Sequence, residues 1–122
     1  MKINPKLLYE NNYDNTNKKG YMKFSNGIMI CYGSWSGNIS FPSSPSWGSL
    51  YTTGINPNLT FAKEFTQIYS CNVAGVRTSS NSAWLFDSTF DNTGISYVQF
   101  ARPSSVGSMP YGIDYIAIGS WK

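Results

Sequence analysis

GYMKFSNGIMICYGSW, residues 20–35, is the stretch that decides the expected fold. Two β-prone runs meet at Asn26-Gly27, the dipeptide that most readily adopts the positive φ angles of a type I′ hairpin turn. In the second run, residues 28–32 are all apolar, whereas a half-exposed antiparallel strand alternates between apolar and polar residues. Both faces of this strand therefore need to be shielded from solvent. In so short a chain, one face can pack inside the domain and another copy of the same chain can shield the second face.

A second run with two apolar faces lies near the C-terminal end of the sequence. Tyr115 and Ala117 share one face of this predicted strand, and Ile116 and Ile118 share the other. We expect it to neighbour residues 28–32 at the centre of one sheet. One face would then meet a second sheet, and the other face would meet a symmetry mate.

Further short strands, separated by turn residues, are expected between these two runs. Gly75 suggests a β-bulge within one of them. Strict alternation over residues 95–102 places Ile95 on the face opposite Val98 and Phe100. No stretch supports a long amphipathic helix, so the sequence predicts an all-β fold, specifically an antiparallel β-sandwich.

The length of 122 residues suits one domain with one core. We expect the sandwich to span residues 20–122, preceded by an N-terminal arm or linker over residues 1–19, which are polar and rich in Asn and Lys. The net charge is +3, but five of the nine basic residues lie within the first 23 positions. The remaining body is close to neutral, so binding to nucleic acid is not expected.

The sequence also bears on the compartment. No apolar run approaches the roughly 18 residues that cross a bilayer, and the N-terminal stretch lacks the apolar segment of a secretory signal. We expect a protein without membrane insertion or signal peptide that is made in the cytoplasm. In that reducing compartment, buried free thiols at Cys31 and Cys71 are favoured over a disulfide between them.

Catalysis finds little support, because the chain contains no histidine. Asp87 and Asp91 could form a pair of glycosidase carboxylates. They flank a predicted turn, however, where aspartate is favoured for its hydrogen bonds to the backbone, and we prefer that interpretation. Cys31 lacks an activating base, and the acidic residues do not have calcium-loop spacing. We expect no catalytic residue, no metal site and no cofactor.

Aromatic residues give the sharper signal, because the apolar faces of sugar rings stack on Trp and Tyr while polar neighbours bind the hydroxyl groups. Several of them lie in the Gly-, Ser- and Pro-rich stretch that follows the hairpin, and long loops often carry function. The alternatives are that the loop aromatics and Trp84 pack on the sandwich or in an interface, and that the polar candidates have no partner. The candidate ligand-binding residues are Trp35, Trp47, Tyr51, Trp84, Asp91 and Arg102.

Three motifs in order resemble the C-terminal domain of phage tail fibre proteins. The first is Gly20-Tyr21-Met22-Lys23-Phe24, followed by an Asn-Gly turn, an apolar strand and Tyr32-Gly33. The second is the segment LTFAKEF at residues 59–65, and the third is DYIAIGSWK at residues 114–122. The resemblance covers residues 20–122.

This resemblance implies an H-type lectin-like β-sandwich that assembles as a homotrimer in a tail fibre of a phage or prophage. It implies a non-catalytic, virion-borne domain that attaches to a bacterial surface receptor, usually a glycan. Residues 34–58 look longer and richer in Trp and Pro than the corresponding family connection, which makes this loop our preferred site for specificity. The alternative is a structural trimerisation cap without receptor contact. A small cell-wall hydrolase is disfavoured by the missing histidine.

Overall fold

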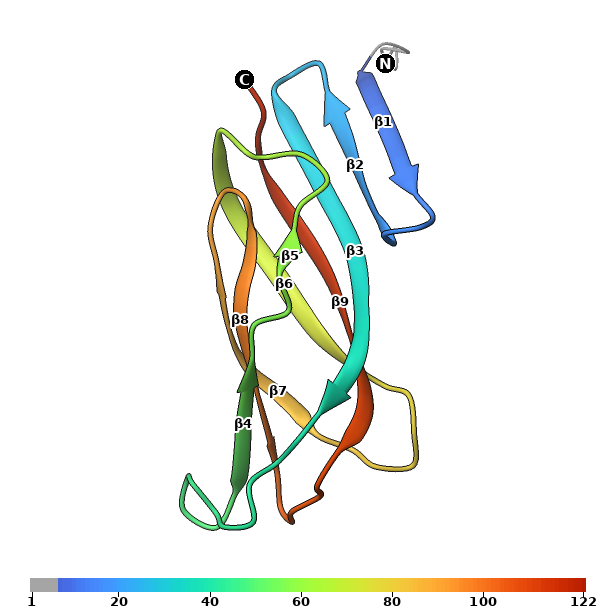
Figure 1. Ribbon diagram of the computed structural model, residues 1–122. Coiled ribbons are helices and arrows are strands. Elements are labelled where there is room, and N and C mark those ends of the chain that lie inside the picture. The colour runs from blue at the N-terminus through green and yellow to red at the C-terminus, as the bar shows by residue number, and fades with distance from the viewer. Residues whose placement is uncertain (1–6) are drawn as a thin grey trace, which may run out of the picture.

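The computed structural model describes residues 7–122, and every regular element in this range is a β-strand (Figure 1). All strand pairs are antiparallel, so the predicted all-β antiparallel class is confirmed. The strands are β1 (Leu8–Asp14), β2 (Lys19–Phe24), β3 (Ile28–Ile39), β4 (Tyr51–Ile55), β5 (Leu59–Thr60), β6 (Gln67–Arg77), β7 (Trp84–Phe90), β8 (Gly94–Arg102) and β9 (Met109–Ser120).

Two sheets form the sandwich. The larger sheet has five strands in the order β1-β2-β3-β9-β6. In the smaller, four-stranded sheet, β8 lies in the middle, with β4 and β5 along one edge and β7 along the other. The smaller sheet covers the β3-β9-β6 side of the larger one, while β1 and β2 extend beyond it (Figure 1).

The two runs with apolar faces pair with each other at the centre of the larger sheet, as predicted. β3 and β9 are in register from Ile28 opposite Ser120 to Ile39 opposite Met109. The inner face of this pair is completely buried at Met29 and Ile113. Because side chains alternate across a strand, the outer face carries the other apolar set.

The hairpin between β2 and β3 forms where it was predicted, but its turn is not type I′. That turn type requires positive φ at both central residues, whereas Gly27 has φ +95° and Asn26 does not share it. The Gly27 N–H donates to the carbonyl of Phe24 at 3.0 Å, and the Ile28 N–H donates to Asn26 Oδ1 at 3.1 Å. This is the longer kind of hairpin loop that ends in a left-handed glycine.

The bulge in β6 lies between Ile68 and Ser70, not at Gly75 as predicted. Gly75 pairs regularly with β9, and a Cβ there would lie 2.7 Å from Tyr111 Oη. The glycine is therefore explained by the close approach of a ring. The bulge turns Ile68 toward the core and leaves Tyr69 57% exposed.

A register shift against β7 also changes the faces of β8. Thr89 pairs with Tyr97 and Phe90 pairs with Ile95, so one extra β8 residue is accommodated between them. Ile95 is consequently buried on the same side as Val98 and Phe100. The predicted placement of Ile95 on the opposite face is wrong, because strict alternation does not survive a bulge.

The expected N-terminal arm contributes a strand to the larger sheet. β1 pairs with β2, and the Tyr9 ring stacks on Trp121 with 5.0 Å between ring centroids. Residues 1–6 lie outside the described range, and the domain boundary at residue 20 stays a prediction.

Both cysteines are free, as predicted. Cys31 on β3 and Cys71 on β6 pair with Ala117 from its two sides. They are therefore two strand spacings apart, about 9.5 Å, whereas a disulfide needs Cα atoms within about 7 Å.

Candidate functional site

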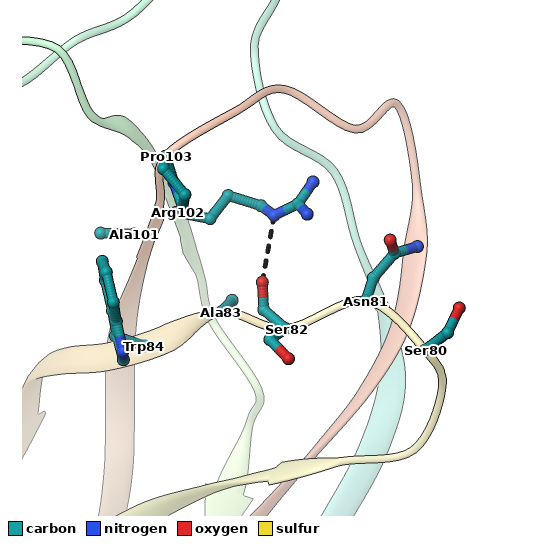
Figure 2. A pocket seen from close by; sticks show the side chains of 8 residues that line it. All are labelled: Ser80, Asn81, Ser82, Ala83, Trp84, Ala101, Arg102 and Pro103. Carbon is teal, nitrogen blue, oxygen red and sulfur yellow. Dashed lines mark hydrogen bonds between the residues drawn. The ribbon is translucent and has the colours of Figure 1, made fainter.

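Of the six candidate ligand-binding residues, the structure brings Trp84 and Arg102 into one pocket (Figure 2). The pocket has a volume of about 370 Å³, near the lower end of the range of about 300–1,000 Å³ for small-molecule sites. It lies where β7 begins and β8 ends. Its lining residues are Ser80, Asn81, Ser82, Ala83, Trp84, Ala101, Arg102 and Pro103. We call it the Trp84–Arg102 pocket.

Two side chains from the sandwich hold the backbone on one side of this pocket. The segment between β6 and β7 passes from the larger sheet to the smaller one. Arg102 Nε–H donates to the carbonyl of Ser82 at 3.0 Å, and the Tyr111 hydroxyl donates to the carbonyl of Ala83 at 2.6 Å. Consecutive carbonyl groups are thereby fastened to both sheets, which preorganises the pocket wall.

Arg102 is held in place while part of its guanidinium group stays available. Its Cζ lies 5.9 Å from the centroid of the buried Phe41 ring, a cation–π contact. The one ion pair within residues 7–122 joins Lys23 and Glu10 at 4.0 Å, so Arg102 forms no ion pair in this range. Of the eight lining residues, all of them described, Arg102 alone is charged. The pocket is therefore electropositive.

Trp84 is 61% exposed, so packing in the core does not explain it. It pairs with Ala101 across β7 and β8, on the outer face of the smaller sheet. Ser80, Asn81 and Ser82 supply polar groups beside it. An exposed aromatic ring with polar neighbours suits a ligand that has an apolar face and hydroxyl groups.

Trp47 provides a second exposed aromatic ring near β7. A tight turn closes through hydrogen bonds between Trp47 and Leu50, with Gly48 at φ +60°. Trp47 is 57% exposed, and its ring lies 5.2 Å from that of Phe86 on β7. The long loop thus places one aromatic side chain, rather than the predicted three, at the surface of the smaller sheet.

Trp35 and Tyr51 lie elsewhere than expected. β3 continues to Ile39, so Trp35 belongs to a strand, opposite Ile113, and is half-buried against the core. Tyr51 is also half-buried against the core. Both positions favour the alternative in which these rings pack the sandwich.

Asp91 lies at the other end of β8 from the Trp84–Arg102 pocket. Its Oδ1 accepts hydrogen bonds from Thr93 N at 2.8 Å, Thr93 Oγ1 at 2.6 Å and Gly94 N at 3.2 Å. These bonds, that of the Thr93 hydroxyl first, lower the pKa of the Asp91 carboxyl. The geometry is that of a turn-forming aspartate, the interpretation preferred for Asp87 and Asp91 from sequence.

Solved structures of pyocin fibres share this architecture. A structure of the P. aeruginosa R1 pyocin fibre comprising C-terminal residues 323–701 aligns with a TM-score of 0.56 at 13% identity, over 90% of this chain and 28% of that one. An N-truncated R1-type pyocin tail fibre aligns with a TM-score of 0.53 at 14% identity, over 90% of this chain and 85% of that one. The fold is that of pyocin tail fibre domains. No protein-family model matches the chain, and no curated protein matches its sequence.

The tail fibre likeness confirms the resemblance predicted from sequence, whereas the H-type lectin relationship stays a prediction. The chain spans little more than a quarter of the first fibre structure, so the likeness concerns only part of that protein. Within residues 7–122, no helix is long and apolar enough to cross a membrane, and no group of three acidic, Cys or His side chains could hold a metal ion.

Neither cysteine thiol, Cys31 or Cys71, is activated as a nucleophile. Burial raises the pKa of Cys31, and burial followed by the neighbouring Cys31 raises the pKa of Cys71 to about 11. A reactive cysteine needs a lowered pKa.

Sequence reasoning missed the polar residues that line the pocket, above all Ser80, Asn81 and Ser82. The available signal was the run TSSNS at residues 78–82, a cluster of turn-forming polar residues between two strands. Such a run predicts a loop. That this loop lies beside Arg102 follows from the pairing of β7 with β8.

Proposed function

We propose that this chain is a receptor-binding domain of a phage or prophage tail fibre and that it attaches to a bacterial surface glycan without catalysis. The Trp84–Arg102 pocket carries the proposal, because it combines an exposed aromatic ring, a polar wall and a preorganised cation. The likeness to pyocin tail fibre domains supports the fibre role and a place in the virion tail.

We also propose that the chain assembles as a homotrimer through the outer face of its larger sheet. Met22, Ile30 and Ile118 are cross-strand neighbours on β2, β3 and β9. Ile116 on the same face is 44% exposed, and Ile118 is 39% exposed. These four residues define the aliphatic face. Contiguous aliphatic surface of this kind marks an association site, and the sequence resemblance points to threefold assembly.

The distribution of exposed side chains supports adhesion over a purely structural cap. The outer face of the larger sheet carries the aliphatic face together with the exposed Tyr13 ring. Trp84 and Phe86 lie on β7 of the smaller sheet, and the Trp47 ring packs beside Phe86. In a cap, the aromatic side chains would be hidden in the interface between subunits. Here Trp84 and Phe86 lie on the sheet that does not carry the aliphatic face, so assembly and receptor contact can proceed together.

The test is binding of the purified chain to host cells and to an array of bacterial glycans. Truncating an aromatic anchor of a binding site costs about 2 kcal/mol, so we expect Trp84→Ala to weaken binding more than about tenfold. The assembly mass should be unchanged, because Trp84 is not part of the aliphatic face. Tyr97→Ala is the control, since Tyr97 is an exposed aromatic residue (41%) on the same sheet but lines none of the described pockets. Equal binding by Trp84→Ala and the parent would rule out this site.

A further inference from the structure

Building on the receptor-binding function above, we propose that the Trp84–Arg102 pocket selects anionic sugars, those that carry a carboxylate or a phosphate. The charge of the pocket is the first observation. Arg102 contributes a permanent positive charge, and none of the other seven described lining residues offsets it. The nearest acidic residue along β7 is Asp87, which pairs with Gln99 and does not line the pocket.

The part of Arg102 that stays available is the second observation. Nε is engaged with the carbonyl of Ser82, and Cζ lies over the Phe41 ring, 5.9 Å from its centroid. The terminal Nη1 and Nη2 groups form no hydrogen bond or ion pair within the described range. Two such parallel N–H groups match two oxygens of a carboxylate or phosphate, and this fork needs little reorganisation to bind them.

The placement of the remaining groups suits a sugar rather than a small inorganic anion. Figure 2 shows the Arg102 side chain running along the backbone of Ser82, with its terminal nitrogens on the side of Asn81 and with Trp84 at the other end of the pocket. A ring stacked on Trp84 and an anionic group held by Arg102 would therefore be two ends of one ligand. The Ser80 and Asn81 side chains are available for hydroxyl groups.

The probe is an array of bacterial surface polysaccharides, each printed in its native form, after reduction of its carboxyl groups, and after removal of phosphate with hydrofluoric acid. We expect binding of the full chain to native acidic polysaccharides and loss of binding after one treatment. Loss on carboxyl reduction identifies a carboxylate, and loss on dephosphorylation identifies a phosphate. Equal binding to all three forms overturns the anionic selectivity while glycan attachment stands. Binding to no polysaccharide and to no host cell overturns both.

Variants of Arg102 assign the selectivity to this pocket. Charge-assisted hydrogen bonds contribute about 1.5–3 kcal/mol, so Arg102→Gln should weaken binding to the native acidic polysaccharide about ten- to hundredfold. Arg102→Lys should recover part of the loss, because it keeps the charge but not the fork. Arg77→Gln removes the same charge outside the pocket lining and should bind like the parent. If Arg102→Gln and Arg77→Gln lose affinity equally, the pocket is not the anion site.

The salt dependence of binding tests the anionic selectivity on the parent chain alone. Raising the salt concentration should weaken binding to the native acidic polysaccharide and leave binding to any neutral polysaccharide unchanged, because salt screens exposed charge pairs. Binding to the acidic polysaccharide that does not respond to salt would overturn the inference.

Discussion

Replacing Ile116 by aspartate should convert the assembled protein into monomers that keep their fold. Fully burying an isoleucine side chain contributes about 1.5–3 kcal/mol. Ile116 and Ile118 are already more than half-buried, with relative exposures of 44% and 39%. About 1 kcal/mol per side chain therefore remains to be gained on association.

Six such side chains in a trimer correspond to about 6 kcal/mol, or about four orders of magnitude in the association constant. Ile116→Asp removes half of this contribution and places three carboxylates in the interface. Burying each unpaired charge costs several kcal/mol, which exceeds the contribution that Ile118 retains. The variant should therefore stay monomeric at concentrations at which the parent is trimeric.

The assay is the molar mass by light scattering at micromolar concentrations, with far-ultraviolet circular dichroism to follow the fold. Trp47→Asp serves as the control, because it introduces the same charge at an exposed apolar position in the loop that packs beside Phe86 of the smaller sheet. We expect a trimer for the parent and for Trp47→Asp, and a folded monomer for Ile116→Asp. A monomeric parent, or a trimeric Ile116→Asp variant, would refute the assignment of the aliphatic face.

Two further predictions concern the dependence of stability on pH. The pKa of Asp91 is lowered from 3.8 in the folded protein, so the stability that its turn contributes is present above pH 3.8 and is lost as the pH falls through the folded pKa. Asp91→Asn should flatten the acid limb of a plot of melting temperature against pH, and an unchanged limb would contradict this. The Cys71 thiol ionises near 9.0 when unfolded and near 11 when folded, so unfolding releases a proton in this window and stability should fall as the pH rises through it. Cys71→Ala should reduce this alkaline loss of melting temperature; an identical loss in the parent and the variant would exclude the thiol as its cause.

The centre of the sandwich could be predicted from sequence because its signal is local. Each of β3 and β9 has apolar residues on both faces, a pattern that can be recognised within the strand itself. In the structure one of these faces is buried and the other is the apolar outer face of the sheet. The Asn-Gly dipeptide placed the hairpin correctly but not its turn type, because the type also depends on loop length. Bulges escaped prediction for a related reason. The shift at Ile68 and the one between Ile95 and Tyr97 depend on how a strand pairs with its neighbour, and not on the composition of the strand.

The residue types of the candidate site were visible in the sequence, whereas their grouping was not. Trp84 and Arg102 were both singled out, together with Trp35 and Tyr51, which pack half-buried against the core, and Asp91, which lies in a turn. A chain can show that a ring or a charge is unusual for its local context. The register between β7 and β8 decides which of these side chains line one pocket. That register depends on the turn between the two strands and on two bulges, which the sequence alone does not reveal.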